Sequence, residues 1–197
     1  VYSISRNIKA REDYSFKYPR QVDLANEDSI DKFSSEIKND GVKVDALINN
    51  AGAFLNKPFE KISKKEFEYI FQVNVFGLSS ITRKVLPIID SKGHIVNITS
   101  MGGINGTTKF PGLTAYSSSK GAVNILTELL AEEYKESGPS FNALAFGAVQ
   151  TEMLEEAFPG LKAPISAKGI ADFVLDFSLN GQKYFNGKII PVSSTTP

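Results

Sequence analysis

The segment Val44-Asp-Ala-Leu-Ile48 is a short apolar run that leads directly into the polar, glycine-containing turn Asn49-Asn50-Ala51-Gly52. Apolar runs of roughly four to eight residues that end in turn residues are typical of buried strands. Two runs further along the chain, Gly93–Ser100 and Ser140–Ala145, have the same character. These segments therefore predict strands of a buried sheet.

Segments with apolar residues at helical spacing separate these strands. We expect helices over Asn26–Lys38, Ser63 to about Pro87, Thr114–Lys135 and Ser166–Leu179, and further strands at Val1–Ser5, Tyr18–Leu24 and Gly187–Val192. Asn26 can cap the first of these helices, and Ser63 with Glu66 forms a capping box at the start of the second. Strands joined by helices need crossover connections, and strands without strict alternation are covered on both faces. The sequence therefore predicts an α/β fold with a doubly wound parallel sheet, in a single domain over residues 1–197.

Composition excludes several classes of function. The chain of 197 residues has 22 Lys and Arg against 22 Asp and Glu, so it lacks the excess positive charge that nucleic-acid binding requires. It has no cysteine and one histidine, which argues against a disulfide framework, a thiolate nucleophile and a zinc site. No apolar run approaches the roughly 20 residues that span a bilayer. We expect a soluble, cytoplasmic protein with no metal and no nucleic-acid or membrane partner.

The most specific motif is Tyr116-Ser-Ser-Ser-Lys120, which falls on a predicted helix. Residues four apart lie on one helix face, so the phenol and the ammonium point the same way. A nearby cation lowers the pKa of a phenol from its usual value near 10, which makes a general acid/base of the pair. The alternative is a solvent-facing tyrosine beside a surface lysine.

Other polar residues follow the strands, where ligands bind in doubly wound sheets. Ser100 ends one strand and can donate a hydrogen bond to a carbonyl oxygen, although serine is also common in loops. In the segment Asn49–Gly52, the asparagines can tie strands together and the glycine admits a ligand, unless the segment is a simple turn. Asn74 precedes Gly77 within the long helix, which indicates either a bend that exposes a carbonyl or a packing glycine.

Taken together and in this order, these motifs resemble those of the short-chain dehydrogenase/reductase family, from Val1 to about Val192. The resemblance implies a Rossmann-like, three-layer αβα fold. It also implies catalytic roles for Asn74, Ser100, Tyr116 and Lys120.

The resemblance further implies a nicotinamide cofactor. Asp23 and Leu24 match the pair placed against the adenine, and Asn50, Ala51 and Gly52 belong to the family's Asn-Asn-Ala-Gly segment. The segment that lines the nicotinamide matches at Gly147, Val149 and Thr151, while Tyr116 and Lys120 also contact the cofactor.

Four departures from the family pattern stand out. The glycine-rich turn and the strand before it are absent, so we expect an upstream strand and turn to precede Val1. Ser100 and Tyr116 have 15 residues between them, more than is usual, and we expect Gly102–Lys109 to hold the extra residues as a loop at the mouth of the site. Phe146 replaces a proline before Gly147, and the end reads Val192-Ser-Ser-Thr rather than Val-Asp-Gly-Gly.

Arg6 ends the first visible strand, where the family faces the adenosine ribose. A basic residue there pairs with a 2′-phosphate, and the planar guanidinium matches phosphate oxygens. We therefore expect NADP rather than NAD, with a surface arginine as the alternative.

The remaining expectations concern surfaces. We expect His94 to be a surface residue at the end of the sheet opposite the site. An apolar segment at Met153–Leu161, within about 151–165, is typical of a substrate lid. The long helix carries Phe67, Phe71, Phe76 and Ile81 as core or as a subunit contact, and the resemblance implies a homodimer or homotetramer.

These observations predict an NADP-dependent oxidoreductase that acts on a carbonyl/alcohol pair. Tyr116 would protonate the developing alkoxide, Lys120 would lower the pKa of Tyr116 and hold the nicotinamide ribose, and Ser100 would bind the carbonyl oxygen. Asn74 would hold a water that links Lys120 to solvent. The alternatives are a non-catalytic nucleotide sensor or scaffold on the same fold, and an isomerase or dehydratase that uses the same tyrosine.

Overall fold

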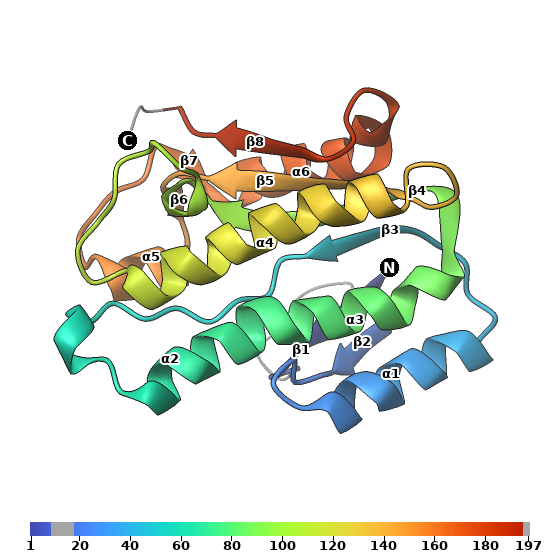
Figure 1. The fold of residues 1–197 in the computed structure, drawn as a ribbon, viewed down its shortest axis with the longest axis horizontal. Coiled ribbons are helices and arrows are strands. Elements are labelled where there is room, and N and C mark those ends of the chain that lie inside the picture. The colour runs from blue at the N-terminus through green and yellow to red at the C-terminus, as the bar shows by residue number, and fades with distance from the viewer. Residues whose placement is uncertain (9–17, 195–197) are drawn as a thin grey trace.

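A parallel sheet forms the centre of the molecule, as the sequence predicts. The structure is a computed structural model that describes residues 1–8 and 18–194. Four strands pair in the order β3 (Val44–Asn49), β4 (Ile89–Ser100), β5 (Ser140–Phe146) and β8 (Lys188–Val192), and all pairings are parallel. Figure 1 shows the arrowheads of β3, β5 and β8 pointing the same way. The carboxyl ends of these strands therefore meet at one edge.

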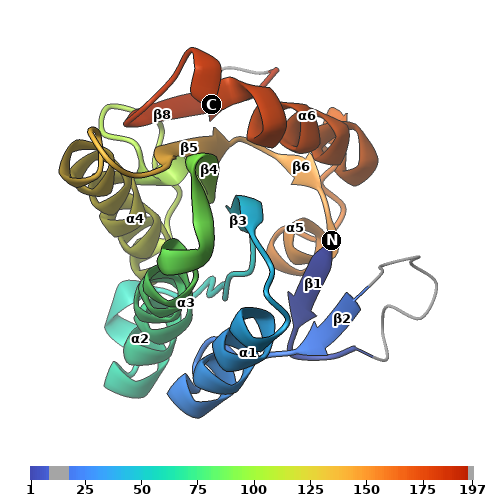
Figure 2. The same ribbon diagram turned by 90° about the vertical axis from the view of Figure 1, so that its right-hand side faces the viewer.

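The first two strands form a separate parallel pair, β1 (Tyr2–Ser5) with β2 (Tyr18–Gln21). Figure 2 shows this pair on the β3 side of the four-stranded sheet. Within the described residues β1 and β3 are not hydrogen-bonded to each other. The expectation that a further strand lies between them stays a prediction.

Helices cover both faces of the sheet, as expected for a doubly wound fold. On one face α4 (Thr114–Glu133) packs against β4 and β5, and α3 (Leu78–Val85) packs against β3 and against α1 (Glu27–Asn39). Figure 2 shows α6 (Ala167–Asn180) on the opposite face. The remaining elements are α2 (Lys64–Phe71), α5 (Glu152–Ala157), and the short parallel strands β6 (Val149–Gln150) and β7 (Ile165–Ser166).

The predicted capping residues fix the starts of two helices. Asn26 Oδ1 accepts a hydrogen bond from Ser29 N at the start of α1, at 3.1 Å. Ser63 and Glu66 form the reciprocal capping box at the start of α2. These contacts satisfy amide groups that a helix leaves without partners at its first turn.

The long helix is interrupted where the sequence placed its bend. Between α2 and α3, Gln72–Gly77 forms a π-helical turn. A Cβ on Gly77 would lie 2.2 Å from the Leu24 carbonyl oxygen, so glycine allows close packing of this turn against the loop after β2. The helix is therefore distorted at Asn74, and Gly77 is a packing residue, while the exposed carbonyl stays a prediction.

The described residues form three core clusters. The one with the most buried residues is formed largely by α1, α2 and α3, and the other two lie on opposite sides of β4 and β5. Ile95 and Phe141 are fully buried on the α4 side with Ala131, while Val96 and Leu144 are fully buried on the α6 side with Phe177. In the part of the chain that the structure describes, no helix is both long and apolar enough to cross a membrane.

The expectation for His94 is wrong, because its side chain is fully buried within β4. Its Nδ1 lies 3.2 Å from the Ser178 carbonyl oxygen, so this nitrogen carries the proton. Its Nε2 lies 2.8 Å from Asn142 Nδ2, a donor, so this nitrogen accepts. The Asn142 amide is oriented by the Lys188 N–H on its oxygen and by the Phe185 carbonyl on its nitrogen. A buried position with polar partners supplied by distant segments has no local sequence signal.

Because its surroundings fix His94 in the neutral form, the protein should lose stability in mild acid. Burial lowers the pKa of His94 below its usual value near 6.5, so the unfolded chain takes up a proton at higher pH than the folded chain. The stability is fully present above about pH 6.5 and is lost as pH falls towards the folded-state pKa, by at most about 1.4 kcal/mol per pH unit.

Urea unfolding at several pH values, with His94→Gln as the control, checks this expectation. The wild type should lose more stability than His94→Gln between about pH 7 and pH 5, the range in which histidine titrates. Parallel losses in the two proteins would contradict the account.

Candidate active site

The candidate residues gather at the carboxyl edge of the sheet. Ser100 ends β4 and is paired in register with Phe146, the last residue of β5. Tyr116 and Lys120 come from the first two turns of α4, which packs against both strands. The turn Asn50–Gly52 follows β3 at the same edge. The topology therefore brings together groups that lie up to about 70 residues apart in the sequence.

Hydrogen bonds of two buried asparagine side chains connect the strands and helices near this edge. Asn49 Nδ2 donates to Asn97 Oδ1 at 2.8 Å and to Thr82 Oγ1 at 3.0 Å, and Asn97 Nδ2 donates to Thr127 Oγ1 at 2.9 Å. These contacts join β3, β4, α3 and α4. Asn49 is thus the strand tie that the sequence predicts, while Asn50 is exposed in the turn itself.

Asn74 connects that turn to the helix that carries Tyr116. Its Oδ1 accepts from Ala53 N at 2.7 Å, and its Nδ2 donates to Ala53 O at 2.9 Å and to Ser119 Oγ at 2.9 Å. The Ser119 hydroxyl in turn donates to the Tyr116 carbonyl at 2.7 Å. The side-chain amide is therefore engaged by the chain itself. The water that the sequence predicts between Lys120 and solvent stays a prediction.

Lys120 is a buried cation with much of its donor capacity unused. Its Nζ donates to Ile98 O at 2.9 Å, the single acceptor that the described residues provide. Burial lowers the pKa of Lys120 to about 8. An ammonium has three donors, so two can serve a ligand.

Tyr116 lies between Lys120 and an aromatic ring. Lys120 Nζ is 5.7 Å from the centroid of the Tyr116 ring, and the ring of Phe54 is 5.0 Å away on a tilted plane. Burial raises the pKa of Tyr116, and a hydrogen bond with the Ser100 side chain opposes this rise. The pKa of Tyr116 is therefore raised, and not lowered as the sequence predicts, because burial disfavours the phenolate.

Ser100 faces the phenol from the end of β4. Its hydroxyl accepts a hydrogen bond from Gly102 N at 3.2 Å, within the short 3₁₀ turn Met101–Gly103. That contact leaves the hydroxyl proton available for Tyr116 or for a ligand oxygen. Ser100, Tyr116 and Lys120 thus form one cluster.

The residues expected to hold a nicotinamide dinucleotide fit that group at the lysine end. A Cβ on Gly52 would lie 3.4 Å from Lys120 Nζ and 3.3 Å from Asn74 Oδ1, so glycine keeps the space beside the ammonium open. Unused lysine donors beside an open turn suit the hydroxyls of a ribose. The chemistry of this donor set is therefore compatible with the expected cofactor.

The other expected cofactor residues lie along the same edge. Asp23 and Leu24 follow β2, and Asp23 Oδ1 accepts from Ala25 N at 2.9 Å, which shapes this loop. Gly147 N donates to Val192 O at 3.0 Å, Val149 is buried in β6, and Thr151 caps α5 by accepting from Leu154 N at 3.2 Å.

Arg6 is exposed at the end of β1, where the sequence placed it. Its Nη1 donates to the Tyr69 hydroxyl on α2 at 2.5 Å. Tyr69 and Phe54 were not predicted from the sequence, because each contacts a residue that is distant in the chain. An aromatic residue two positions after Asn-Asn-Ala-Gly was the available signal for Phe54.

The segment after β6 is held against two other loops, as a lid would be. Asn56 Nδ2 donates to Ala157 O at 3.1 Å, and the Phe110 ring meets Phe158 edge-on at 6.3 Å. The helix in this segment, α5, is shorter than the expected lid.

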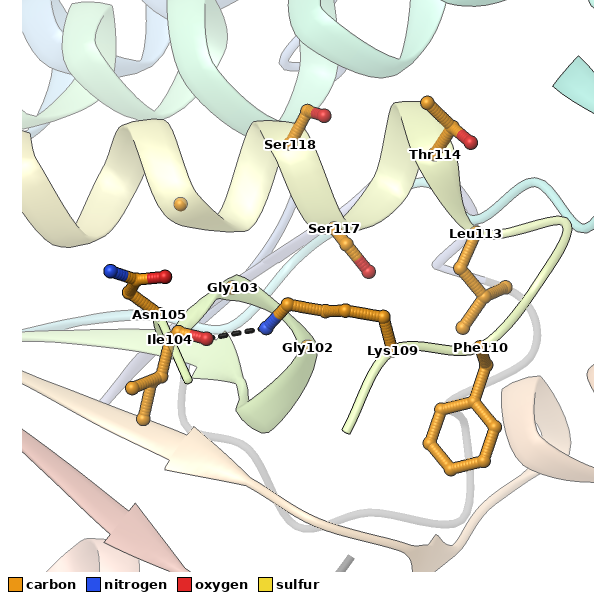
Figure 3. A pocket seen from close by; sticks show the side chains of 11 residues that line it. Gly102, Gly103, Ile104, Asn105, Lys109, Phe110, Leu113, Thr114, Ser117 and Ser118 are labelled. Carbon is orange, nitrogen blue, oxygen red and sulfur yellow. Dashed lines mark hydrogen bonds between the residues drawn. The ribbon is translucent and has the colours of Figure 1, made fainter. Parts of the chain in front are cut away.

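The loop with the extra residues borders a pocket of about 450 Å³ against the start of α4. In Figure 3, Ser117 points into this space and Lys109 lies across it to reach the Ile104 carbonyl. The pocket is lined by the neighbour of Tyr116 rather than by Tyr116 itself, so it lies beside the candidate site.

Comparison with known proteins identifies the family. The family model for short chain dehydrogenase matches residues 5–162, so the chain belongs to this family. It is 33% identical over 151 residues to cyclopentanol dehydrogenase from Comamonas sp. (strain NCIMB 9872), covering 76% of this chain and 58% of that protein. It is 35% identical over 162 residues to L-2,3-butanediol dehydrogenase from Corynebacterium glutamicum, covering 80% and 59%. The chain thus spans less than two thirds of these relatives.

Solved structures agree in fold. A 4-hydroxyisoleucine dehydrogenase mutant complexed with NADH and succinate superposes with a TM-score of 0.86 at 23% identity, over 100% of this chain and 88% of that one. Pseudomonas aeruginosa RhlG, in an active-site complex with NADP, gives 0.85 at 21% identity, over 99% and 85%. A ribose-5-phosphate isomerase from Brucella melitensis 16M gives 0.85 at 24%, over 97% and 79%. At such identities the likeness concerns the fold.

The buried side-chain amide of Asn74 should contribute more to the free energy of unfolding than an exposed side-chain amide does. Asn74→Ala leaves Ala53 N, Ala53 O and Ser119 Oγ without this partner. Each buried polar group left unsatisfied costs about 1–3 kcal/mol. We expect a loss of about 3 kcal/mol or more in the free energy of unfolding, measured in urea.

Asn180→Ala is the matched control, because its amide makes exposed hydrogen bonds with Asp176 on α6 and with Lys183 in the 3₁₀ turn that follows. We expect it to cost less than about 0.5 kcal/mol. Equal losses for the two variants would show that the Asn74 contacts do not hold the site.

Proposed function

We propose that this protein is an NADP-dependent oxidoreductase that transfers a hydride between the nicotinamide and a carbonyl/alcohol substrate. The observation that carries the proposal is the cluster of Ser100, Tyr116 and Lys120 at the carboxyl edge of the sheet. It combines an uncharged proton donor, a hydroxyl within reach of it and a buried cation. A nucleotide sensor or scaffold has no need of such a set.

The chain's own groups handle the substrate oxygen and its proton. When bound, the cofactor supplies the hydride. Ser100 donates a hydrogen bond to the carbonyl oxygen and orients it. Tyr116 Oη gives its proton to that oxygen as negative charge develops there. The raised pKa of Tyr116 keeps this proton in place at neutral pH, which suits reduction.

Lys120 and Asn74 have binding and positioning roles in this proposal. We propose that the two unused donors of Lys120 bind the nicotinamide ribose. The positive charge of Lys120, 5.7 Å from the centroid of the Tyr116 ring, would favour the ionised phenol in the oxidation direction. Asn74 fixes the turn before Phe54 against α4, so it acts as a positioning residue through Ala53 and Ser119.

Arg6 supports NADP over NAD. It is an exposed guanidinium at the end of β1, and no described acidic group lies within ion-pair distance of it. A guanidinium without a carboxylate partner there suits a 2′-phosphate, whereas the ribose 2′-hydroxyl of NAD is usually bound by a carboxylate.

We propose a small or medium apolar carbonyl compound or its alcohol as the substrate. Phe54 lies against Tyr116, and the lid segment packs by an aromatic contact between Phe158 and Phe110. The names of two relatives, cyclopentanol dehydrogenase and L-2,3-butanediol dehydrogenase, specify small alcohols as their substrates. These observations favour an apolar substrate over a charged one.

We also propose a homodimer or homotetramer. Ile81 is core, and Phe67 and Phe71 stack on each other with ring centroids 5.3 Å apart. Phe76 is instead 57% exposed, and Ile125 and Leu129 on α4 are 58% and 62% exposed. Phe76 is thus the member of the expected set that is available for a subunit contact.

Replacing Tyr116 should abolish turnover without preventing cofactor binding. Tyr116→Phe keeps the ring beside Phe54 and removes the proton donor, and loss of a positioned acid costs about 10²–10⁴-fold in rate. We expect a fall of this size in kcat for oxidation of NADPH with a panel of apolar ketones and aldehydes. Tyr134→Phe, at the other end of α4, is the control and should keep full activity. Substantial turnover by Tyr116→Phe would refute the assignment.

Replacing Arg6 should change the choice of cofactor. Arg6→Asp puts a repelling carboxylate where the 2′-phosphate is expected. We expect kcat/KM for NADPH to fall by about tenfold or more while that for NADH falls less or rises, since charge-assisted hydrogen bonds are worth about 1.5–3 kcal/mol. Arg83→Asp, an exposed change on α3, should alter neither. Equal effects of Arg6→Asp on both cofactors would show that no phosphate contact exists.

A further inference from the structure

A contact between Arg6 and Tyr69 joins two segments that are distant in the sequence. Arg6 directly follows β1, and Tyr69 lies on α2, 63 residues further along the chain. Arg6 Nη1 donates to the Tyr69 hydroxyl at 2.5 Å. Both side chains are exposed, and Tyr69 retains 41% of its accessible surface. Such a contact needs a reason, because exposed arginine side chains are usually free to move.

The geometry leaves the useful part of the guanidinium open. An arginine has five N–H donors in a planar fork, and the Tyr69 hydroxyl takes one of them. The donors on Nε and Nη2 remain, and such adjacent donors bind two phosphate oxygens side by side. The contact therefore orients the side chain without using up its phosphate-binding edge.

The chemistry of the partner also matters. A carboxylate in place of Tyr69 would neutralise the guanidinium and repel a phosphate. A phenol accepts the hydrogen bond while leaving the positive charge of Arg6 in place. The partner is thus suited to holding an arginine for an anionic ligand rather than to forming an ion pair.

Tyr69 is itself held by a rigid support. Its helix begins at the Ser63–Glu66 capping box. The neighbouring Ile70 is buried in a core cluster, and Phe67, two residues before Tyr69, packs against the same cluster. The hydroxyl of Tyr69 is therefore a fixed point against which a long, flexible side chain can be aligned.

We propose that Tyr69 is a specificity-determining positioning residue, which holds Arg6 in the orientation that binds the 2′-phosphate of NADP. This inference rests on the proposed NADP-dependent function. It adds that discrimination between NADP and NAD depends on a residue of α2 that contacts Arg6. Ordering the arginine before the cofactor arrives lowers the entropy cost of binding.

Calorimetric titration of the full chain with NADPH and with NADH tests the proposal through binding alone. The variants are Tyr69→Phe, Arg6→Ala and the double variant. The control is Tyr2→Phe, on the strand that precedes Arg6, which removes a tyrosine hydroxyl that donates to Asp40 at 3.0 Å. Thermal unfolding of each variant establishes that it is folded.

We expect Tyr69→Phe to weaken NADPH binding by about three- to tenfold, the size of one net hydrogen bond, and NADH binding by less than about twofold. Tyr2→Phe should bind both cofactors as the wild type does. In the Arg6→Ala background, Tyr69→Phe should have no further effect on NADPH.

The outcomes separate the two proposals. If Arg6→Ala weakens NADPH selectively but Tyr69→Phe binds like the wild type, the role of Tyr69 is refuted and the NADP assignment stands. If Tyr69→Phe weakens NADPH equally with and without Arg6, Tyr69 does not act through the arginine. If Arg6→Ala leaves NADPH unchanged, the NADP assignment fails as well.

Discussion

The candidate site depends on the hydrogen bonds of one side chain, that of Asn74. Its amide pairs with both main-chain groups of Ala53 and with Ser119, so one residue joins the turn after β3 to the helix that carries Tyr116 and Lys120. The π-helical turn Gln72–Gly77 brings Asn74 to this position. The same π-helical turn packs against the loop after β2 through Gly77. Two loops at the edge of the sheet and the helix α4 are therefore set relative to one another by a single distorted helix.

Burial gives the cluster its chemistry. Lys120 is held charged in a buried position by one carbonyl, and its pKa falls to about 8. Tyr116 is kept protonated because burial disfavours the phenolate. A ligand that supplied hydroxyls to Lys120 would change both the position of the ammonium and the field at the phenol. The site therefore suits a ligand whose oxygen atoms accept hydrogen bonds from the remaining donors of Lys120.

The sequence predicted those features that depend on local order. The capping box of Ser63 and Glu66, the disrupted helix around Asn74 and the alternation of strands and helices all follow from spacing along the chain. The position of Tyr116 and Lys120 on one helix face is of the same kind. Each could be predicted because the interacting residues lie within a few positions of one another.

Features made by distant segments were missed or misread. His94 has the sequence context of a strand end, and its burial follows from Asn142 and Ser178, 48 and 84 residues away. Tyr69 carries no local signal of its role, since its contact is with Arg6, 63 residues away. The direction of the pKa of Tyr116 was also missed, since it depends on burial rather than on the spacing to Lys120.

Transfer of a deuterium label tests the central claim most directly, because it follows the reacting atom itself. The full chain would be given NADPH deuterated at the transferable position of nicotinamide C4, together with an apolar ketone, and the products examined by mass spectrometry. The account predicts that the label appears on the carbinol carbon of the alcohol, in proportion to the cofactor oxidised. A substrate that is converted while the label stays on the cofactor, or label lost without appearing in the alcohol, would contradict it.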